Sequence, residues 1–376
     1  MRKIKILHVQ ETIASGGVER TRLSLAKLLD KDQFEQKIIC TDASGNMVDE
    51  IRKEGVEIIA IGILKSPFQW SQHKKVKKII QEYQPDIIHG AVFEGVTMAA
   101  INGWLKKVPI IIIEETSDPQ NRSWKGNLLM TLFSKLAHKV VGVSEGVTEE
   151  YLKGKLKIPS EKAILVNNGV ALPRAISDTE ITATKRSLHI SENDFVIGSV
   201  GRMLQDEHKR FSDLIKAFAK FASNKDNAKL LLLGDGPERM NYEKLVKELD
   251  ITEKVIFAGY QQDVTLFYNL MNVFSLVSAY EAFGLVLAEA MLNKLPVVAT
   301  SVGGMKYIVD HEKTGFLVER FNTDSIAEKF EVLYQNDHLR KQMGTNGYVK
   351  ALVEYTEDVY AKKIESLYLE LFKSKI

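Results

Sequence analysis

The chain of 376 residues contains 45% apolar and 27% charged residues and has a formal net charge of +2. This length exceeds what one hydrophobic core usually fills and favours two domains, while the small charge argues against a basic, nucleic-acid-binding surface. Apolar runs fall short of the ~20 residues that span a bilayer, and the charged start turns directly into a strand pattern, so we expect no signal peptide.

The single cysteine, Cys40, ends the apolar run Ile38–Cys40. It allows no intrachain disulfide, and a buried structural thiol is its expected role. Together with the missing signal peptide, this cysteine usage favours a cytoplasmic protein.

Short β-branched runs alternate with helical patterns in the first half of the chain. The expected helices include Glu19–Leu29 and Lys74–Tyr83. This alternation predicts βαβ units and a parallel sheet that is buried on both faces. The expected strands are Ile4–Val9, Gln36–Thr41, Val56–Ile61, Asp86–His89, Ile110–Ile113, Lys139–Val143 and Ala163–Val166.

A polar stretch without a strong period, from Ala171 to Asp194, then interrupts this pattern. We expect a first domain over 1–175, a linker over 176–194 and a second domain over 195–355. The last segment, 356–376, is helical in pattern and could close the second domain or cross back to the first. The expected strands of the second domain are Phe195–Val200, Lys229–Leu233, Val255–Phe257, Val273–Val277, Val297–Ala299 and Gly315–Leu317, and its helices are Phe211–Ala222, Tyr242–Leu249, Leu285–Leu292 and Asp324–Leu333.

The fold class that follows is α/β, with two Rossmann-like, doubly wound parallel sheets that face a cleft. Such sheets bind ligands at the carboxyl ends of their strands, so the segments that follow each strand are the candidate sites.

Two glycines, Gly16 and Gly17, follow the first strand in Ser15-Gly16-Gly17-Val18 and open the first helix. Paired glycines allow close backbone approach, and helix-start N–H groups favour anions. The pattern is not Gly-x-Gly-x-x-Gly, which disfavours a nicotinamide dinucleotide site. An ordinary tight turn is the alternative.

Two cations follow the first strand of the second domain. Gly201 ends that strand and delivers Arg202 to the sheet edge, and Lys209 follows seven residues later, where the next helix begins. Fixed cations in that position suit a diphosphate leaving group, whose charge grows as it departs. Ordinary surface Arg and Lys are the alternative. Gly234 lies in a further strand-to-helix turn that could underlie a nucleotide or be only a turn.

The segment from Ser278 to Met291 carries the strongest signal. Glu281 lies in a strand-to-helix loop, Gly284 frees the backbone at the helix start, and Glu289 lies inside an otherwise apolar helix. A carboxylate there is costly unless it meets specific donors, and ribose hydroxyls are such donors. Glu281 could hold sugar hydroxyls, while backbone N–H groups of Phe283 to Leu285 face phosphate. A solvated or capped helix residue is the alternative for Glu289.

The order of these motifs resembles the large retaining glycosyltransferase family 4, of GT-B fold. The likeness covers nearly the whole chain and is densest from Val196 to Val318. The Glu-x7-Glu pattern of the family is matched by Glu281 and Glu289, and its Gly-Arg…Lys pair by Arg202 and Lys209. Further matches are Gly16-Gly17, Asn168-Gly169-Val170 and Val141-Gly142-Val143-Ser144.

The resemblance implies a role for each matched residue. Arg202 and Lys209 would bind the donor diphosphate, Glu289 the ribose, and Glu281 the transferred sugar. Base contacts would come from the region of Tyr260, and Gly17 would lie near the phosphates and the acceptor. No metal is implied, because cations and helix dipoles take its part. The remaining donor contacts would come from Gly16, Gly234, Ala282, Phe283, Gly284 and Leu285.

One departure concerns the acceptor side. Many members carry a histidine after the strand equivalent to Ile110–Ile113, whereas this chain reads Glu114-Glu115-Thr116-Ser117-Asp118-Pro119. This version resembles a subgroup that builds bacterial surface polysaccharides on lipid carriers. Glu115 is the residue that we align with the acceptor-side position, as a base, a positioning group or a structural residue. His89, which ends a strand, is expected to point toward the cleft, with a satisfied buried histidine as the alternative.

The expected function is retaining transfer of a hexose or N-acetylhexosamine from a nucleotide sugar, with UDP as the expected nucleotide, to a glycan or lipid-linked acceptor. The candidate catalytic residues are Glu281, Arg202, Lys209, Glu115 and His89. The alternatives are a sugar-nucleotide epimerase or phosphorylase of the same fold, and an inactive nucleotide-sugar-binding scaffold.

Aromatic residues and lysines in the first domain suggest a membrane-surface face. They lie in Phe68-Gln69-Trp70, in Trp124–Leu136, and near the basic run His73–Lys78 and the pair Lys106-Lys107. Solvated helix faces are the alternative, and contact with anionic lipid at the inner face of the cell membrane is the functional interpretation.

Overall fold

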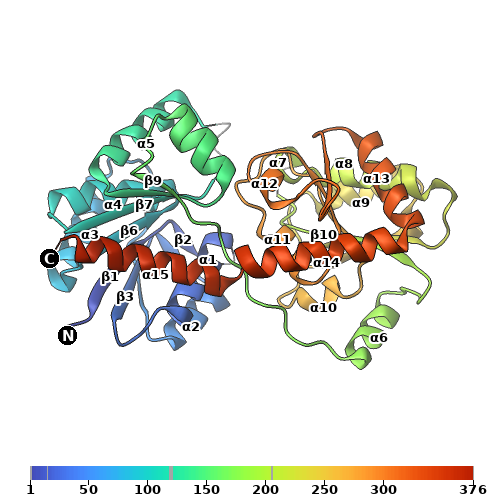
Figure 1. The fold of residues 1–376 in the computed structure, drawn as a ribbon, viewed down its shortest axis with the longest axis horizontal. Coiled ribbons are helices and arrows are strands. Elements are labelled where there is room, and N and C mark those ends of the chain that lie inside the picture. Colours follow the sequence, from blue (N-terminus) through green and yellow to red (C-terminus); the bar gives the residue numbers. More distant parts are fainter. Residues whose placement is uncertain (1, 15, 118–121, 205, 376) are drawn as a thin grey trace. The chain divides into compact units, whose positions relative to one another are not determined.

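A computed structural model describes residues 2–14, 16–117, 122–204 and 206–375 of the chain (Figure 1). The chain divides into two compact units. The first unit is Met1–Val170 with Tyr355–Ile376, and the second is Ala171–Glu354. Each unit is a parallel β-sheet with helices on its faces, as the alternating pattern predicts.

The first unit contains a seven-stranded sheet in the order β5-β3-β1-β6-β7-β8-β9, and the pairs that join these strands are parallel. Its strands are β1 (Ile4–Val9), β3 (Phe34–Cys40), β5 (Glu57–Ala60), β6 (Ile87–Ala91), β7 (Ile110–Glu115), β8 (Lys139–Gly142) and β9 (Ala163–Leu165), and a separate short pair joins β2 (Thr12–Ile13) to β4 (Asp42–Ala43). Its helices are α1 (Gly17–Leu28), α2 (Asn46–Lys53), α3 (Trp70–Tyr83), α4 (Val92–Leu105), α5 (Trp124–Leu136), the π-helix η2 (Gly146–Lys155) and α15 (Glu357–Lys373).

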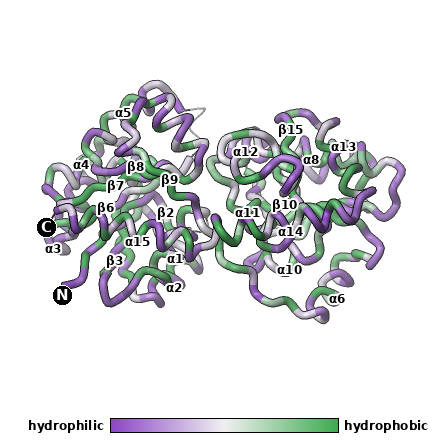
Figure 2. Tube along the Cα trace, viewed as in Figure 1, coloured by the Kyte–Doolittle hydropathy of each residue, from purple (hydrophilic) through white to green (hydrophobic). Residues whose placement is uncertain are grey.

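Helices α1 and α15 cover one face of this sheet (Figure 1). Successive strand residues point to opposite faces, so Ile110 and Ile112 of β7 join the cluster that includes Tyr360 and Ile364 of α15. Helix α4 contacts β6 and β7. Because helices cover both faces, the strands are hydrophobic runs with little alternation, which Figure 2 shows in green.

The second unit contains a six-stranded sheet in the order β12-β11-β10-β13-β14-β15, with every pair parallel. Its strands are β10 (Phe195–Val200), β11 (Ala228–Leu233), β12 (Val255–Gly259), β13 (Val273–Leu276), β14 (Val297–Thr300) and β15 (Gly315–Val318). Its helices are α6 (Asp178–Ser187), α7 (Asp206–Lys209), α8 (Phe211–Phe221), α9 (Arg239–Glu248), α10 (Thr265–Tyr268), α11 (Leu285–Leu292), α12 (Met305–Ile308), α13 (Thr323–Gln335) and α14 (Asp337–Glu354), with 3-10 turns η3 (Ala222–Asn224) and η4 (Thr252–Lys254).

The segment 176–194, which its polar composition suggests is a linker, contains α6 and belongs to the second unit. Ser177 and Glu180 form a capping box at its start, and the helix contains no buried residue. Arg174 binds Glu180 at 2.8 Å and Asp263 at 2.6 Å, which ties the segment to this unit. A helix held by a cap and ion pairs has no apolar stripe to reveal it in the sequence.

The C-terminal segment returns to the first unit, which is one of the two alternatives that its sequence allows. Val170 forms a parallel bridge with Thr356, and Glu357 N donates to Val170 O at 2.9 Å. The motif Asn168-Gly169-Val170 therefore lies against the start of α15. That helix then buries Tyr360, Ile364 and Tyr368 in the core beside β1 and β6.

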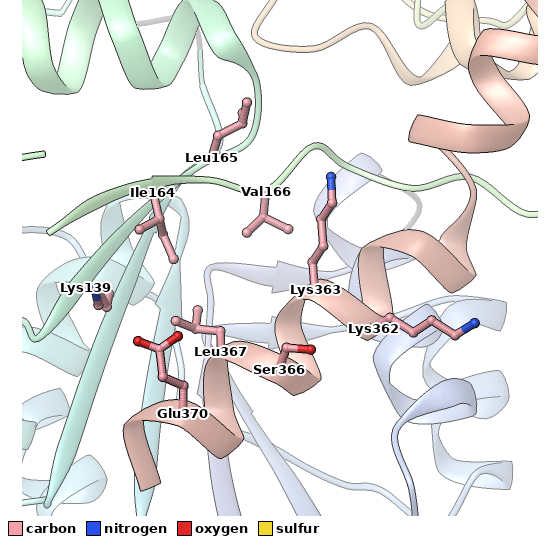
Figure 3. A pocket seen from close by; sticks show the side chains of 9 residues that line it. All are labelled: Lys139, Ile164, Leu165, Val166, Lys362, Lys363, Ser366, Leu367 and Glu370. Carbon is pink, nitrogen blue, oxygen red and sulfur yellow. The ribbon is translucent and has the colours of Figure 1, made fainter. Parts of the chain in front are cut away.

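A surface groove of about 470 Å³ runs between β9 and α15 (Figure 3). Its floor is apolar, with Ile164, Val166 and Leu367, and three lysines lie around it. None of the predicted site residues is among the residues that line it, which are Lys139, Ile164, Leu165, Val166, Lys362, Lys363, Ser366, Leu367 and Glu370.

Candidate active site

The second sheet reverses its strand order between β10 and β13. From β10 the chain proceeds outward through β11 and β12, and it then returns to place β13 on the other side of β10. Gly198 of β10 pairs with Leu231 on one side and with Phe274 on the other. Such a reversal leaves an opening at the carboxyl ends of the strands, where doubly wound sheets bind ligands. Arg202 follows β10, and Glu281 follows β13, so both motifs lie at this position.

Lys209 and Glu281 form an ion pair at this edge. The Nζ atom of Lys209, the last residue of α7, lies 2.5 Å from Oε2 of Glu281. Both side chains are partly exposed, at 29% and 17%. The two loops are also joined by their backbones, because Ala279 N donates to His208 O at 2.8 Å. Two motifs that lie 72 residues apart in sequence therefore place a cation and a carboxylate together.

Arg202 follows β10 at the same edge of the sheet, and its side chain is exposed. Lys209 passes close to its neighbour Gly201, since a Cβ added to Gly201 would lie 3.9 Å from Cδ of Lys209. Gly234, which follows β11, has a φ of +122° and packs against the carbonyl of Gly201, where a Cβ would collide. The glycine at 234 thus lets the loops after β10 and β11 stack.

Gly284 places the start of α11 beside Glu281. It is the N-cap residue, with a φ of +95°, a conformation that glycine adopts at no steric cost. Gly304 N donates to Glu281 O at 3.0 Å, which joins this loop to the segment after β14. Ala282 and Phe283 are buried, and Leu285 is the first residue of α11. The loop that contains Glu281 is therefore bonded to the segment after β10 and to the segment after β14, and it leads directly into the N-terminus of α11.

Glu289 lies in the second turn of α11 and is partly buried. Its Oε2 accepts a hydrogen bond of 2.8 Å from the hydroxyl of Tyr268 in α10. This tyrosine could not be recognised from sequence, because α10 is four residues long and precedes an ordinary buried strand. Tyr260, which follows β12, is 68% exposed at the same sheet edge.

The glycine pair of the first unit begins α1. Gly16 is the N-cap residue and Gly17 the first helical residue, while Ser15 lies outside the described residues. The Glu19 carboxylate folds back toward Gly16 and accepts from Thr12 Oγ1 at 3.2 Å. Burial, Glu94 and Glu19 together raise the pKa of nearby Glu11. Three carboxylates, those of Glu11, Glu19 and Glu94, therefore lie near one another beside the start of α1.

Glu115 ends β7 as a buried, fully engaged carboxylate. It forms a two-point ion pair with Arg122, and Oε1 also accepts from Ser117 Oγ at 2.7 Å. The Arg122 guanidinium lies 5.5 Å from the ring centroid of Phe93 and 5.6 Å from that of Tyr151. This arrangement favours a positioning or structural role for Glu115 over that of a free base. Asp118 and Pro119 of the same motif lie outside the described residues.

Glu114 points to the other face of the sheet and pairs with Arg22 of α1 in the interior of the first unit. Both side chains are almost fully buried. Burial alone would raise the pKa of Glu114, but Arg22 and His89 outweigh burial and hold the pKa at about 2. Arg22 also donates to the hydroxyl of Tyr360 at 3.3 Å.

His89 is enclosed in the same interior cluster, so the expectation that it points toward the cleft is wrong. It has no exposed surface, and its Nδ1 lies 2.7 Å from the hydroxyl of Tyr368 in α15. Its Nε2 lies 3.4 Å from Glu114. Burial, reinforced by Arg22, lowers its pKa and favours the neutral ring. Because α15 covers this face of β6, the side chain meets the helix, as in the alternative of a buried histidine, although only Nδ1 has a hydrogen-bond partner among the described residues.

Comparison with known proteins identifies the family. The model of "Glycosyl transferases group 1" matches residues 180–350, and that of "Glycosyltransferase Family 4" matches residues 15–174. The capsular polysaccharide biosynthesis glycosyltransferase CapM of Staphylococcus aureus is 30% identical over 99% of both chains. The chain belongs to the family 4 glycosyltransferases.

Two further relatives of this family 4 glycosyltransferase have more specific names. One is the N-acetyl-alpha-D-glucosaminyl L-malate synthase of Bacillus anthracis, 32% identical over 52% of this chain, and the match spans only about half (50%) of that relative. The other is the UDP-Gal:alpha-D-GlcNAc-diphosphoundecaprenol alpha-1,3-galactosyltransferase of Escherichia coli, 24% identical over 99% of this chain and 98% of the relative.

The solved structures confirm the GT-B fold of this glycosyltransferase. The crystal structure of Anabaena Alr3699/HepE in complex with UDP superposes with a TM-score of 0.86. It is 20% identical and covers 98% of this chain and all of that chain. The two Rossmann-like sheets that the sequence predicts are therefore those of GT-B glycosyltransferases.

Proposed function

We propose that this glycosyltransferase moves a hexose or N-acetylhexosamine from a UDP-sugar to a glycan or lipid-linked acceptor, with retention of anomeric configuration and without a metal ion. The observation that carries the proposal is the Lys209–Glu281 pair at the position where the second sheet reverses its strand order. It places a cation for a leaving phosphate next to a carboxylate for sugar hydroxyls.

The donor chemistry follows from these side chains. Lys209, together with Arg202, would neutralise the charge that grows on the diphosphate as the glycosidic bond breaks. Glu281 would accept hydrogen bonds from the transferred sugar, and Glu289 from the ribose. The choice of UDP as the donor nucleotide is supported by HepE, whose crystal structure is in complex with UDP. Two fixed cations and the N-terminus of α11 would supply the charge that a metal ion would otherwise provide.

Retention without a protein nucleophile requires that the acceptor oxygen attack the face of the sugar that the phosphate leaves. We propose that the acceptor O–C1 bond forms as the C1–O bond to phosphate breaks, and that the acceptor proton passes to a phosphate oxygen of the leaving diphosphate. No protein nucleophile takes part in this scheme. It suits the observed site, where Glu281 is engaged by Lys209 at 2.5 Å.

The relatives' names support the acceptor class. CapM is named for capsular polysaccharide biosynthesis, and the Escherichia coli relative for a diphosphoundecaprenol-linked acceptor. Both names describe transfer, as does the family model, which disfavours an epimerase or a phosphorylase. On the first unit, we propose that Glu115 positions the acceptor indirectly, through Arg122 and Ser117.

A panel of UDP-, GDP- and ADP-sugars, each incubated with excess EDTA, tests this function. We expect nucleotide release from a UDP-sugar and, where the sugar is transferred to an acceptor hydroxyl, a glycoside whose anomeric configuration in NMR matches that of the donor. An inverted product would contradict retention, and activity only after addition of Mg²⁺ would contradict metal independence. Conversion of the donor sugar into an epimer in the absence of an acceptor would indicate an epimerase. Binding of UDP without turnover of any donor would indicate a scaffold.

Helix α5 presents an exposed apolar stripe that supports peripheral membrane contact. Trp124, Leu128 and Leu132 recur every fourth residue and are 71%, 51% and 45% exposed. The opposite side of the helix buries Met130 and Phe133. Lysines at 125 and 135 flank the stripe, an arrangement typical of helices that lie on anionic lipid. No described helix is long and apolar enough to cross a membrane. We propose a cytoplasmic protein that contacts the inner face of the cell membrane.

Vesicle co-sedimentation at low salt tests this contact. Leu128→Asn with Leu132→Asn should weaken binding to phosphatidylglycerol vesicles by roughly tenfold or more, since each leucine contributes ~1.5–3 kcal/mol when buried. The matched control is Val349→Asn with Val353→Asn, an exposed pair of equal spacing on α14 of the second unit, which should bind like the unaltered protein. Absence of co-sedimentation of the unaltered protein would refute the membrane proposal.

A further inference from the structure

Tyr268 fixes one oxygen of Glu289. Its hydroxyl donates to Oε2 of Glu289 at 2.8 Å and lies 3.4 Å from the carbonyl oxygen of Val286. The tyrosine is the last residue of α10 and is only 1% exposed, so bulk water cannot replace this bond. A buried phenol that reaches a carboxylate is a strong and directional contact, because the acceptor is charged.

The tyrosine is itself held in place. Its ring packs edge-on against Phe274 of β13, with the ring centroids 5.6 Å apart. Its backbone is tied at both ends, since Tyr268 N donates to Val264 O at 3.1 Å and Met271 N donates to Tyr268 O at 3.1 Å. The hydroxyl is therefore a fixed point at the side of α11, set by the central strand of the sheet.

Glu289 gains orientation from this fixed point. A glutamate has three side-chain torsions, and a partly exposed one samples several rotamers. The bond from Tyr268 selects those in which Oε2 faces α10. One oxygen of the carboxylate is then held before a ligand arrives, which reduces the entropy that binding must overcome.

We propose that Tyr268 is a positioning residue that orients the Glu289 carboxylate toward the ribose hydroxyls of the donor, and so makes the enzyme discriminate between nucleotides with and without those hydroxyls. This inference rests on the proposed function, in which Glu289 binds ribose. Tyr268 acts through Glu289 and not on the diphosphate. Its loss should therefore reduce recognition of the ribose hydroxyls while the contribution of the cations Arg202 and Lys209 stays the same.

The experiment measures, by calorimetry, the dissociation constants of UDP, 2′-deoxy-UDP and 3′-deoxy-UDP. The readout is the ratio of the dissociation constant of each deoxy analogue to that of UDP. We expect at least one ratio to be roughly tenfold for the unaltered protein, as for a hydrogen bond to a charged group. Tyr268→Phe should lower that ratio to about two. In a Glu289→Ala background, Tyr268→Phe should change the ratio no further.

The matched control is Tyr334→Phe. Tyr334 also belongs to the second unit, and its hydroxyl donates one hydrogen bond of 3.1 Å to Asn227, which the variant loses. Asn227 directly precedes β11, at the amino end of that strand. For Tyr334→Phe, the ratio of each deoxy analogue's dissociation constant to that of UDP should equal the ratio for the unaltered protein. If Tyr268→Phe cannot be recovered folded, Glu289→Asp serves instead. The shorter aspartate keeps the carboxylate charge but moves it away from the Tyr268 hydroxyl. An unchanged ratio for this variant would overturn the inference.

The outcomes separate the inference from the proposed function. A ratio for Tyr268→Phe equal to that of the unaltered protein, with UDP still bound, overturns the positioning role alone. A ratio near one for the unaltered protein overturns the ribose role of Glu289, and the inference with it. If UDP does not bind at millimolar concentration, the proposed function itself fails.

Discussion

Replacing Lys209 with alanine should lower kcat/KM for sugar transfer by about 10²- to 10³-fold, the range seen when one group that stabilises developing negative charge is removed. The variant loses the cation that lies 2.5 Å from Glu281, and it leaves that carboxylate next to the site of a departing diphosphate. Initial rates with a saturating acceptor and a varied UDP-sugar measure the effect. Most of the loss should be in kcat, because the charge develops in the transition state.

Lys216→Ala is the matched control for this prediction. Lys216 is an exposed lysine on α8 of the same unit, and its removal should leave kcat/KM within about twofold of the unaltered enzyme. Equal rates for Lys209→Ala and Lys216→Ala would show that the 209–281 pair has no part in transfer.

Glu114→Gln should lower the unfolding free energy of the first unit by about 3–5 kcal/mol, the cost of leaving one member of a buried ion pair without its partner. The variant removes the charge that faces Arg22 in an interior where both side chains are almost fully buried. All three tryptophans, at positions 70, 104 and 124, belong to the first unit, so urea unfolding followed by tryptophan fluorescence reports on it.

The control here is Glu149→Gln, which breaks an i,i+4 pair with Lys153 on the surface of the same unit. It should cost no more than about 0.5 kcal/mol. A Glu114→Gln protein that unfolds at the same urea concentration as this control would contradict the assignment of Glu114 as a charged, paired interior residue.

The same cluster predicts acid sensitivity. The folded pKa of Glu114, about 2, lies below its ordinary value of 4.5, so its stabilisation is present above pH 4.5 and is lost as the pH falls toward 2. Burial lowers the pKa of His89 below 6.5, so protonation of the unfolded chain removes stability below that pH. Both effects have the same sign, and Glu114→Gln should flatten the stability profile below pH 4.5.

The sheets were predictable because their strands are buried on both faces. Runs such as Ile110–Ile113 cannot be solvent-facing, and each expected strand appears in the structure. Helices without an apolar stripe were not predictable. Helix α14 buries Met343, Gly344, Gly347 and Ala351, so its contact face is built mainly from small residues, and α6 buries none. The capping box and ion pairs of α6 leave no hydrophobic period to detect.

The meeting of Lys209 and Glu281 was predictable because both residues belong to motifs that follow strands of one parallel sheet. Lys209 and Glu281 meet once parallel strand ends are aligned along one edge. Tyr268, Arg22 and Arg122 were not found, because each contributes through one long-range contact and belongs to no local pattern. The sequence also could not show that α15 covers His89, since the sequence of that helix fits either domain.

Calorimetric titration of UDP, in the presence of EDTA, tests the central claim most directly when it is carried out on the unaltered protein, on Lys209→Ala and on Glu289→Ala. That claim is that the strand-order reversal of the second sheet binds the nucleotide of the donor. We predict that the unaltered protein binds UDP and that each variant binds it at least roughly tenfold more weakly. No heat from the unaltered protein at millimolar UDP, or equal affinity in all three proteins, would contradict it.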